Sequence, residues 1–254
     1  MAEPPSPETV SVVVPTLNEV DNVEPLVRQI MTAAPDCLEI LVVDDGSHDG
    51  TRDRVRFLAV QFPVRLLERN APALGLSGAV IAGARAARGE IVVVMDADLS
   101  HPPDDIPQLT APLFAGQAEM VSGSRYIAGG STPGWPLSRR AMSRLAAALA
   151  YPLTGVHDSM CGFFAIRRAR LLELAPDAAS GFKIAFEVIV RGGAAFRVKE
   201  IPIAFCDRTR GTSKMTLRVV LTFSVRWLAA ALRILSRKRL PLKPAAAAAC
   251  ERRI

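Results

Sequence analysis

The sequence predicts an α/β fold built on a mostly parallel β-sheet. Short runs rich in valine and isoleucine alternate along the chain with segments whose apolar residues recur at helical spacing. The short runs are apolar almost throughout, which is typical of strands that are covered on both faces. Strands and helices that take turns in this way form parallel sheets through right-handed crossover connections. We therefore expect a central sheet flanked by helices.

The first half of the chain shows the clearest alternation. In chain order we expect a strand at 11–16, a helix at 22–34, a strand at 39–47, a helix at 51–62, a strand at 64–68, a helix at 76–87 and a strand at 90–96. One face of the first helix is apolar, with Val23, Leu26, Val27, Ile30 and Met31. Thr51 is expected to cap the second helix. The inner side of that helix should carry Val55, Leu58 and Ala59.

The alternation loosens after about residue 105. In chain order we expect a helix at 105–116, a strand at 120–126, a Gly- and Pro-rich loop at 125–136, a helix at 138–155, a strand at 161–168, a helix at 181–193 and a strand at 197–208. No internal repeat of solenoid length is visible. We expect one domain over residues 10–215, after a disordered leader at 1–9.

Composition limits the class of protein. The 254 residues are 50% hydrophobic, which suits one large folded domain and argues against general disorder. The four cysteines form no CxxC pair; they are Cys37, Cys161, Cys206 and Cys250. Neither a zinc site nor a disulfide framework is indicated, so we expect a reducing, cytoplasmic setting. The first ten residues lack the features of a signal peptide.

Basic charge is concentrated near the C-terminus. The net charge is +6, and the stretch from Arg208 to Lys243 holds ten Lys and Arg residues without an Asp or Glu. Such a block suits phosphate groups of a nucleotide, of a nucleic acid or of an anionic membrane, and it also suits a solvated tail. Basic and aromatic residues are not interleaved, so we expect no nucleic-acid partner.

Residues 216–239 are predicted to form a basic amphipathic helix. At helical spacing, one polar arc carries Arg218, Thr222, Arg226, Arg233 and Arg237. The apolar stretch Val219–Leu235 is too short to span a bilayer, and Arg226 lies near its middle. The pattern is typical of a helix lying in a membrane interface, here on the cytoplasmic face. Packing on the domain itself, or on a membrane partner subunit, is the alternative; residues 240–254 form a tail.

Polar residues follow three of the predicted strands. They are Asn18 and Glu19, Asp44 and Asp45, and Asp96 and Asp98. In open parallel sheets, ligands bind beyond the carboxyl ends of the strands, so these side chains are expected to line one crevice. Aspartates in such places also begin turns or cap helices, a reading that fits Asp45 in particular.

The Asp96-Ala97-Asp98 motif indicates a cation site. On an extended segment, alternate residues point the same way, so both carboxylates are expected on one side. Oxygen ligands suit Mg²⁺ or Mn²⁺, and Mg²⁺ typically combines one or two carboxylates with phosphates of the substrate. No Walker loop, no dinucleotide-binding glycine motif and no G-x-S-x-G elbow is present. His101 could help to bind a phosphate, but we expect it instead to hold the turn of the SHPP segment, residues 100–103.

A set of ordered motifs resembles a known family. The segments VVVPTLNE, ILVVDDGSHDGT, MDADLSHPP, GSRY, CGFFAIRR, GFKIAFEVI and DRTRGTSKM occur in the order and spacing of family 2 glycosyltransferases with the GT-A fold. Within that family, the chain is most similar to the dolichyl-phosphate (polyprenyl-phosphate) mannosyltransferases, over about residues 10–215. A receiver-like signalling domain also has an acidic pair after a strand, but it would end near residue 125.

The resemblance implies an activity. It implies transfer of mannose from GDP-mannose to a polyprenyl phosphate with inversion, in the presence of Mg²⁺ or Mn²⁺. The alternatives are a polyprenyl-phosphate glucosyltransferase that uses UDP-glucose, or a family 2 enzyme with a soluble acceptor.

The resemblance also implies site residues. Binding of the nucleotide sugar is implied for Pro15, Leu17, Glu19, Val42, Asp44, Asp96, Ala97, Asp98, Arg125, Arg208 and Lys214. Asp96 and Asp98 are the implied metal ligands, and Asp98 and Arg125 the implied catalytic residues. Arg139 and Arg140 lie in the WPLSRR loop and are expected either to meet the lipid phosphate or to be surface charges.

Overall fold

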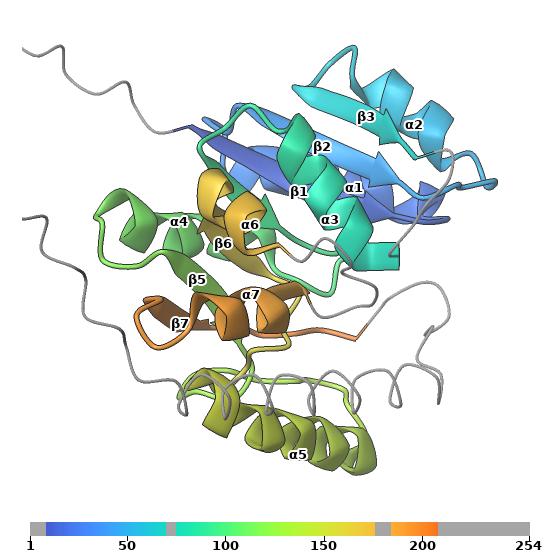
Figure 1. The fold of residues 1–254 in the computed structure, drawn as a ribbon. Helices are drawn as coiled ribbons and strands as arrows, with labels where there is room; N and C mark the ends of the chain where they lie inside the picture. The colour runs from blue at the N-terminus through green and yellow to red at the C-terminus, as the bar shows by residue number, and fades with distance from the viewer. Residues whose placement is uncertain (1–8, 70–74, 176–183, 208–254) are drawn as a thin grey trace, which may run out of the picture.

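The described part of the chain folds around one β-sheet with helices on both faces (Figure 1). The computed structural model describes residues 9–69, 75–175 and 184–207. Within these residues the strands are β1 (Val10–Thr16), β2 (Glu39–Asp44), β3 (Val64–Glu68), β4 (Ile91–Val94), β5 (Met120–Ser124), β6 (Phe164–Arg167) and β7 (Val198–Pro202). They form a seven-stranded sheet in the order β3-β2-β1-β4-β6-β5-β7.

The helices are those that the apolar spacing predicts, with one addition. They are α1 (Val20–Ala33), α2 (Thr51–Leu58), α3 (Gly75–Ala86), α4 (Ile106–Phe114), α5 (Leu137–Thr154), α6 (Arg168–Leu174) and α7 (Ile184–Gly192), with a 3₁₀ turn, η1, at Pro103–Asp105. Helix α6 is the addition. Its first residue was expected to end a strand, but β6 stops at Arg167 and the chain turns directly into the helix.

Alternate residues of the central strands supply two hydrophobic cores. Val12 and Val14 of β1 belong to a core shared with α1, α2 and α4, whereas Val13 between them packs with α3, α6 and α7. The same alternation holds along β2 and β4. Both faces of the sheet are therefore covered, which explains the continuous apolar runs and confirms the predicted architecture.

Strand β6 departs from the parallel arrangement. It runs antiparallel to both β4 and β5, while the remaining neighbouring pairs are parallel. A strand buried on both faces reads as the same apolar run in either direction, so the sequence carries no signal for its orientation. The expectation of a mostly parallel sheet is confirmed.

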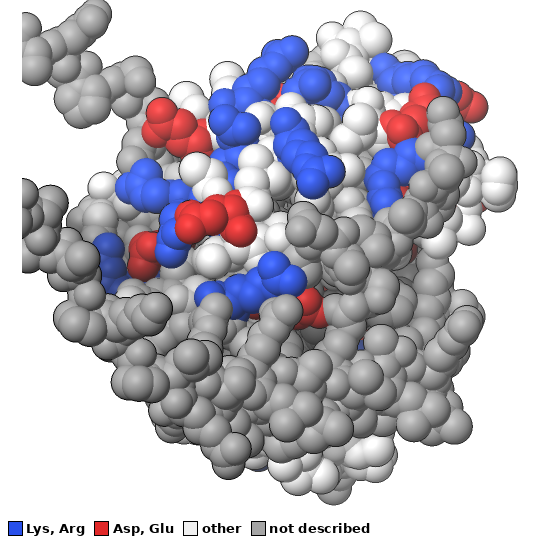
Figure 2. Space-filling model, in the orientation of Figure 1, with Lys and Arg blue, Asp and Glu red and all other residues white. Residues whose placement is uncertain are grey.

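Two expectations for α2 were wrong. Its N-cap is Gly50, with a left-handed φ of 96°, and Thr51 is the first helical residue. The Thr51 hydroxyl instead donates to Asp49 and accepts the main-chain N–H of Glu19. Ala59 lies beyond the helix and is exposed, because α2 ends at Leu58. Around α2 and β3, Arg56 forms ion pairs with both Asp53 and Glu68. Figure 2 shows basic and acidic side chains intermixed on this part of the surface.

The sheet order determines where a ligand site can form. Strand β1 lies between β2 and β4, and all three run parallel, so their carboxyl ends meet at one edge of the sheet. The loops that follow these strands are those that carry the predicted polar residues. The predicted amphipathic helix at 216–239, the tail at 240–254 and all but the last residue of the leader at 1–9 lie outside the described residues.

Candidate nucleotide-sugar and acceptor site

The acidic motif lies in a turn rather than on a strand. Strand β4 ends at Val94, Ala97 and Asp98 are in a turn, and Leu99 has a left-handed φ of 61°. The expectation that Asp96 and Asp98 alternate along an extended segment was therefore wrong. A non-glycine residue in the left-handed region is uncommon and is tolerated where neighbouring contacts impose it.

The two carboxylates have different surroundings. The Asp96 side chain is 32% exposed. Asp98 is buried, and its Oδ1 accepts hydrogen bonds from the Ser100 hydroxyl at 2.6 Å and the Ser100 main-chain N–H at 3.1 Å. Gly162 lies beside Asp96, since a Cβ at this position would come within 3.4 Å of both Asp96 oxygens. Space next to the exposed carboxylate thus depends on the glycine of the CGFF motif.

His101 packs at the base of this turn. Its Nδ1 accepts a hydrogen bond from the main-chain N–H of Asp96 at 3.0 Å. The ring stacks on Phe163 and meets Phe205 edge-on, with both centroid distances at 5.2 Å. Burial lowers the pKa of His101, against the opposing effect of Asp96 and Asp98. His101 therefore holds the segment that begins at Asp96, rather than the SHPP turn for which it was expected.

Arg125 is held by a buried carboxylate. At the end of β5, its Nε and Nη2 donate to the two oxygens of Asp158 at 2.6 and 2.8 Å, and its main-chain N–H also donates to Asp158. Burial alone would lower the pKa of Arg125, but the Asp158 pair raises it above its usual range. Asp158 in turn donates its main-chain N–H to Glu200 of β7. The guanidinium is therefore a fixed, fully charged group.

Aromatic rings connect Arg125 to the acidic turn. The Arg125 guanidinium carbon lies 5.5 Å from the Trp135 ring centre and 5.4 Å from that of Phe205. Phe205 contacts Trp135 on one side and His101 on the other. The main chain follows the same path, because Cys206 donates to the Ser100 carbonyl and Phe205 to that of Ser131. The turn after β4 and the loop after β5 thus form one unit.

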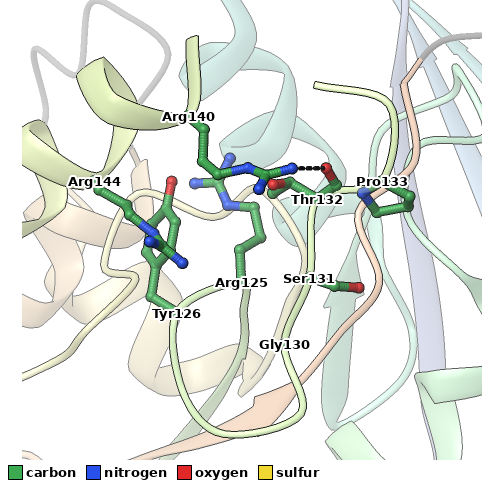
Figure 3. Close-up of a pocket in the computed structure, with 8 residues that line it drawn as sticks. All are labelled: Arg125, Tyr126, Gly130, Ser131, Thr132, Pro133, Arg140 and Arg144. Atoms are coloured by element: carbon green, nitrogen blue, oxygen red, sulfur yellow. Dashed lines mark hydrogen bonds between the residues drawn. The ribbon is translucent and has the colours of Figure 1, made fainter. Parts of the chain in front are cut away.

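A pocket of about 250 Å³ opens next to Arg125 (Figure 3). Its lining residues are Arg125, Tyr126, Gly130, Ser131, Thr132, Pro133, Arg140 and Arg144. Arg140 of α5 donates to the Thr132 carbonyl at 3.3 Å, and its buried Nε has no hydrogen-bond partner among the described residues. Three guanidinium groups around one pocket create a site for an anion.

The two predicted lipid-phosphate arginines have different places. Arg140 lines the pocket, as stated above. Arg139 does not line it: its guanidinium carbon lies 3.9 Å from the Trp135 ring centre, and Nη1 pairs with Asp207 at 2.9 Å. Arg144, which lies one helical turn after Arg140, lines the pocket, whereas Arg139 does not. Arg208 and Lys214 lie outside the described residues.

The loops after β1 and β2 are tied to each other. Asn18, with a left-handed φ of 58°, donates its main-chain N–H to the Ser47 hydroxyl, and its side chain accepts the N–H of His48. Leu17 is 36% exposed at this edge of the sheet, Glu19 is half-buried and Pro15 is buried. The predicted nucleotide-binding residues of the first loop therefore differ widely in their access to a ligand.

Asp44 and Val42 have enclosed side chains. Val42 lies in the core that α1 and α4 share. Asp44 accepts hydrogen bonds from Ser47 and Arg52, and these hold its pKa below its usual range although burial alone would raise it. Val42 therefore packs β2 into the core, and Asp44 stabilises the loop that follows β2. The neighbouring Asp45 is less enclosed and pairs with Arg69 at 2.6 Å.

Sequence reasoning missed three residues of the site. They are Asp158, which holds Arg125, Phe205, which joins the turn to the pocket, and Arg144. Arg144 lies four residues after Arg140 on a predicted helix, so helical spacing could have identified it. No local signal marks Asp158 or Phe205, since each acts on a segment far away in the sequence.

The donor set around Asp96 fits a hard divalent cation that a ligand completes. Among the described residues, no group of three or more His, Cys, Asp or Glu side chains forms a metal cage. Mg²⁺ is commonly held by one or two carboxylates, with phosphate oxygens and waters filling its remaining positions. Asp96, with its exposed carboxylate, and Asp98 are the residues that would hold such an ion.

Fold and site together define a glycosyltransferase of the GT-A type. The sheet presents an acidic turn at the carboxyl ends of its strands, beside an arginine-lined pocket. A sequence model described as "Glycosyl transferase family 2" matches residues 11–174. The chain belongs to this family.

Relatives in three domains of life cover most of this chain. It is 38% identical over 221 residues to "Dolichol-phosphate mannosyltransferase" of Pyrococcus furiosus. The alignment covers 84% of this chain and 61% of the relative. The Saccharomyces cerevisiae protein of that name is 36% identical, with 84% and 83% covered. "Polyprenol monophosphomannose synthase" of Mycolicibacterium smegmatis is 37% identical, with 81% and 80% covered. The chain thus spans under two thirds of the Pyrococcus protein.

Solved structures share the fold. Glucosyl-3-phosphoglycerate synthase from Mycobacterium tuberculosis, in a crystal with Mn²⁺, UDP-glucose and phosphoglyceric acid, superposes with a TM-score of 0.66. The alignment covers 92% of this chain and 81% of the other, at 24% identity. This likeness confirms the GT-A fold.

Proposed function

We propose that the protein transfers mannose from GDP-mannose to a polyprenyl phosphate, with inversion at the sugar C1 and in the presence of Mg²⁺ or Mn²⁺. The observation that carries the proposal is the pairing of two sites with complementary charge. An acidic turn suited to a cation and diphosphate lies next to a pocket lined by Arg125, Arg140 and Arg144, with Phe205 between them. The names of relatives 36–38% identical to this chain support the same sugar and acceptor.

The donor half of the site is assigned to the edge formed by β1, β2 and β4. Asp96 and Asp98 would hold the cation, which when bound would supply a Lewis acid for the diphosphate leaving group. Leu17 and Glu19 lie at the same edge of the sheet and are proposed to line the part of the site that binds the nucleoside. The main chain after Asp44 is proposed to form the bottom of this part of the site. Arg208 and Lys214 are proposed to reach the diphosphate from the segment that follows Asp207. The manganese and UDP-glucose in the M. tuberculosis structure are consistent with this arrangement.

The acceptor half is assigned to the arginine pocket. A phosphate monoester carries close to two negative charges at neutral pH, and fixed guanidinium groups bind its oxygens in bidentate fashion. Arg125 is already oriented by Asp158, and Arg140 has a buried Nε without a partner among the described residues. Arg139 contributes from outside the pocket by stacking on Trp135.

The chemistry needs little proton transfer. The acceptor phosphate oxygen attacks C1 of the sugar as the bond from C1 to the diphosphate oxygen breaks, and GDP departs. Because the phosphate is already ionised, no general base is required, and none is assigned. The chain supplies orientation of the acceptor by its arginines and a preorganised electrostatic environment for the leaving group.

A membrane surface is the proposed partner, on its cytoplasmic side. The exposed side of α5 carries Leu137, Met142, Leu145 and Leu149, between 50% and 79% exposed. At 100° per residue they fall within an arc of about 140°. The described part of the chain contains no helix with the length and apolarity needed to cross a bilayer. An apolar helix face beside an acceptor pocket suits the surface that holds a lipid phosphate.

A direct assay tests the proposed reaction. Purified protein is incubated with radiolabelled GDP-mannose, polyprenyl phosphate and Mg²⁺ or Mn²⁺, and label is measured in the organic phase. We expect labelled lipid only when all components are present, and less label when UDP-glucose replaces the donor. Label that follows UDP-glucose, or a water-soluble acceptor instead of the lipid, would contradict the proposed substrates.

A further inference from the structure

His101 is a buried polar residue beside the site to which the proposed reaction gives no role. It does not line the pocket beside Arg125, and its ring is enclosed by Phe163, Phe205 and the small residue Gly162, whose Cβ position would lie 3.3 Å from the imidazole Cε1. Nevertheless it makes one specific bond, from the main-chain N–H of Asp96 to Nδ1. A buried aromatic position could be filled by phenylalanine if packing were its whole purpose.

The direction of this bond defines the state of the imidazole. A main-chain N–H is always a donor, so Nδ1 must carry a lone pair and the proton of the neutral ring must lie on Nε2. The bond also satisfies the main-chain donor of Asp96, which follows the last sheet hydrogen bond, from the Met95 N–H to the Val13 carbonyl. Without it, the Asp96 peptide would lose its partner inside a turn that already contains the left-handed Leu99.

We propose that His101 is a positioning residue for the cation and diphosphate site. By accepting the Asp96 N–H, it fixes the peptide plane from which the Asp96 carboxylate projects. His101 also contacts Phe205, which in turn contacts Arg125, so the position of the Asp96 peptide is connected to that of the arginine pocket. The inference rests on the proposed function, since it concerns the same site. The inference goes further than the proposed function, because it gives a specific hydrogen-bonding role to a residue that does not contact the cation or the diphosphate.

Two substitutions separate this role from packing. In His101→Asn, the side-chain oxygen can take the place of Nδ1, but the ring is lost. In His101→Phe, the ring remains and the acceptor is lost. Positioning predicts that Asn retains cation-dependent binding of GDP and that Phe weakens it by about 10- to 100-fold, the usual cost of losing a partner that orients a metal ligand. Packing alone predicts the reverse order.

The measurement is calorimetric titration of GDP, in the presence of Mn²⁺, into the full chain and both variants, with thermal melting recorded in parallel. We expect the melting temperatures to rank Phe above Asn, because Phe retains the ring contacts, while the affinities rank Asn above Phe. Affinities that follow the melting temperatures would overturn the proposal. Wild type that binds GDP and Mn²⁺ but makes no mannolipid would contradict the proposed function and leave this inference intact.

A second measurement does not depend on the variants folding. A long-range ¹H–¹⁵N correlation spectrum of wild-type protein with labelled histidine reports which ring nitrogen carries the proton. We expect His101 to show a protonated Nε2 and a bare Nδ1 at neutral pH, and His48 and His157 serve as references because both are exposed or in surface pairs. A proton on Nδ1 would refute the assigned bond and the proposal with it.

Discussion

Two charged residues of the site, Asp98 and Arg125, are each held by a second residue. Asp98 accepts two bonds from Ser100, and Arg125 is gripped by Asp158 in a bidentate pair. Such partners reduce the freedom of a charged side chain, so less entropy is lost when a ligand binds. The Ser100 hydroxyl is buried and already used in this way. Its role is therefore to orient Asp98.

Asp98→Ala should abolish most of the activity. The substitution removes one of the two proposed carboxylate ligands, and loss of one preorganised electrostatic group typically lowers kcat by about 10²- to 10³-fold. We expect a similar loss in mannolipid formation, together with weaker binding of GDP in the presence of Mn²⁺. The control is Asp104→Ala, which removes an exposed acid of the same segment and should change neither quantity. Unchanged turnover of Asp98→Ala at saturating Mg²⁺ or Mn²⁺ would rule out the metal role.

At the scale of single residues, the sequence identified the charged residues of the site but not the residues that hold them in position. The acidic motif and Arg125 stand in short, recognisable segments. Asp158 and Phe205 lie 33 and 80 residues from Arg125 in the chain and meet it only through the order of β5, β6 and β7. Their roles follow from tertiary contacts, which no local pattern encodes.

Helix α3 comes unusually close to the sheet. A Cβ on Gly83 would lie 2.4 Å from Val13 Cγ1 and 3.0 Å from Val43 Cγ2. Both valines are fully buried, and β-branched side chains have little rotamer freedom with which to move away. Glycine at this position therefore allows the helix to cover the β1 and β2 strands that lead into the site.

Gly83→Ala should destabilise the protein. Overpacking costs about 1–3 kcal/mol, and the higher helix propensity of alanine returns up to about 1 kcal/mol. We expect a net loss of about 1 kcal/mol in the free energy of unfolding, measured by urea titration. Arg85→Ala on the exposed side of the same helix is the control and should be nearly neutral. A stabilised Gly83→Ala variant would show that α3 can shift outward at little cost.

The exposed side of α5 should bind vesicles. Replacing Leu145 and Leu149 with Glu puts two charges into the apolar arc, and burying each leucine is worth about 1.5–3 kcal/mol. We expect flotation with anionic vesicles to fall by about tenfold or more, while activity on a short-chain polyprenyl phosphate in detergent persists. The control replaces Phe57 and Val60, exposed apolar residues of α2 and its end, in the same way.

A truncation separates the two proposed membrane contacts. Flotation of the chain without residues 216–254 measures what the predicted amphipathic helix adds to α5. Equal flotation of the Leu145 and Leu149 double variant, its α2 control and wild type would contradict a membrane role for α5.

For the molecule as a whole, hydrophobic patterning sufficed to predict the architecture. Continuous apolar runs predicted strands covered on both faces, and the cores on either side of β1, β2 and β4 confirm this. The direction of β6 could not be predicted, because a strand buried on both faces is the same apolar run in either direction. Helix α6 was missed because it begins at Arg168, directly after β6, in a segment assigned to the strand. The N-cap of α2 was assigned wrongly, because Gly50 is the cap and Thr51 is the first helical residue, with its main-chain N–H donating to Asp49.

A buried acid, Glu39, connects several segments at the end of the sheet opposite the site. Its Oε1 accepts the Ser11 hydroxyl at 2.9 Å and the Arg88 main-chain N–H at 2.7 Å, and its Oε2 pairs with Arg65. These partners join β1, β2, β3 and the connection from α3 to β4. Burial alone would raise the pKa of Glu39, but the three hydrogen bonds lower it below its usual value.

Glu39→Gln should therefore remove a part of the stability that depends on pH. A lowered pKa means that the ionised group stabilises the fold above the unfolded value of about 4.3, and that this stability is lost as the pH falls through the lower folded value. We expect urea unfolding at about pH 7 to show a loss of about 1–3 kcal/mol in the variant. The difference from wild type should shrink as the pH approaches about 3. Glu24→Gln, in a surface pair with Arg28, should differ from wild type by less than about 1 kcal/mol. A deficit in Glu39→Gln that stayed constant from neutral to acid pH would mean that the hydrogen bonds, and not the charge, hold these strands together.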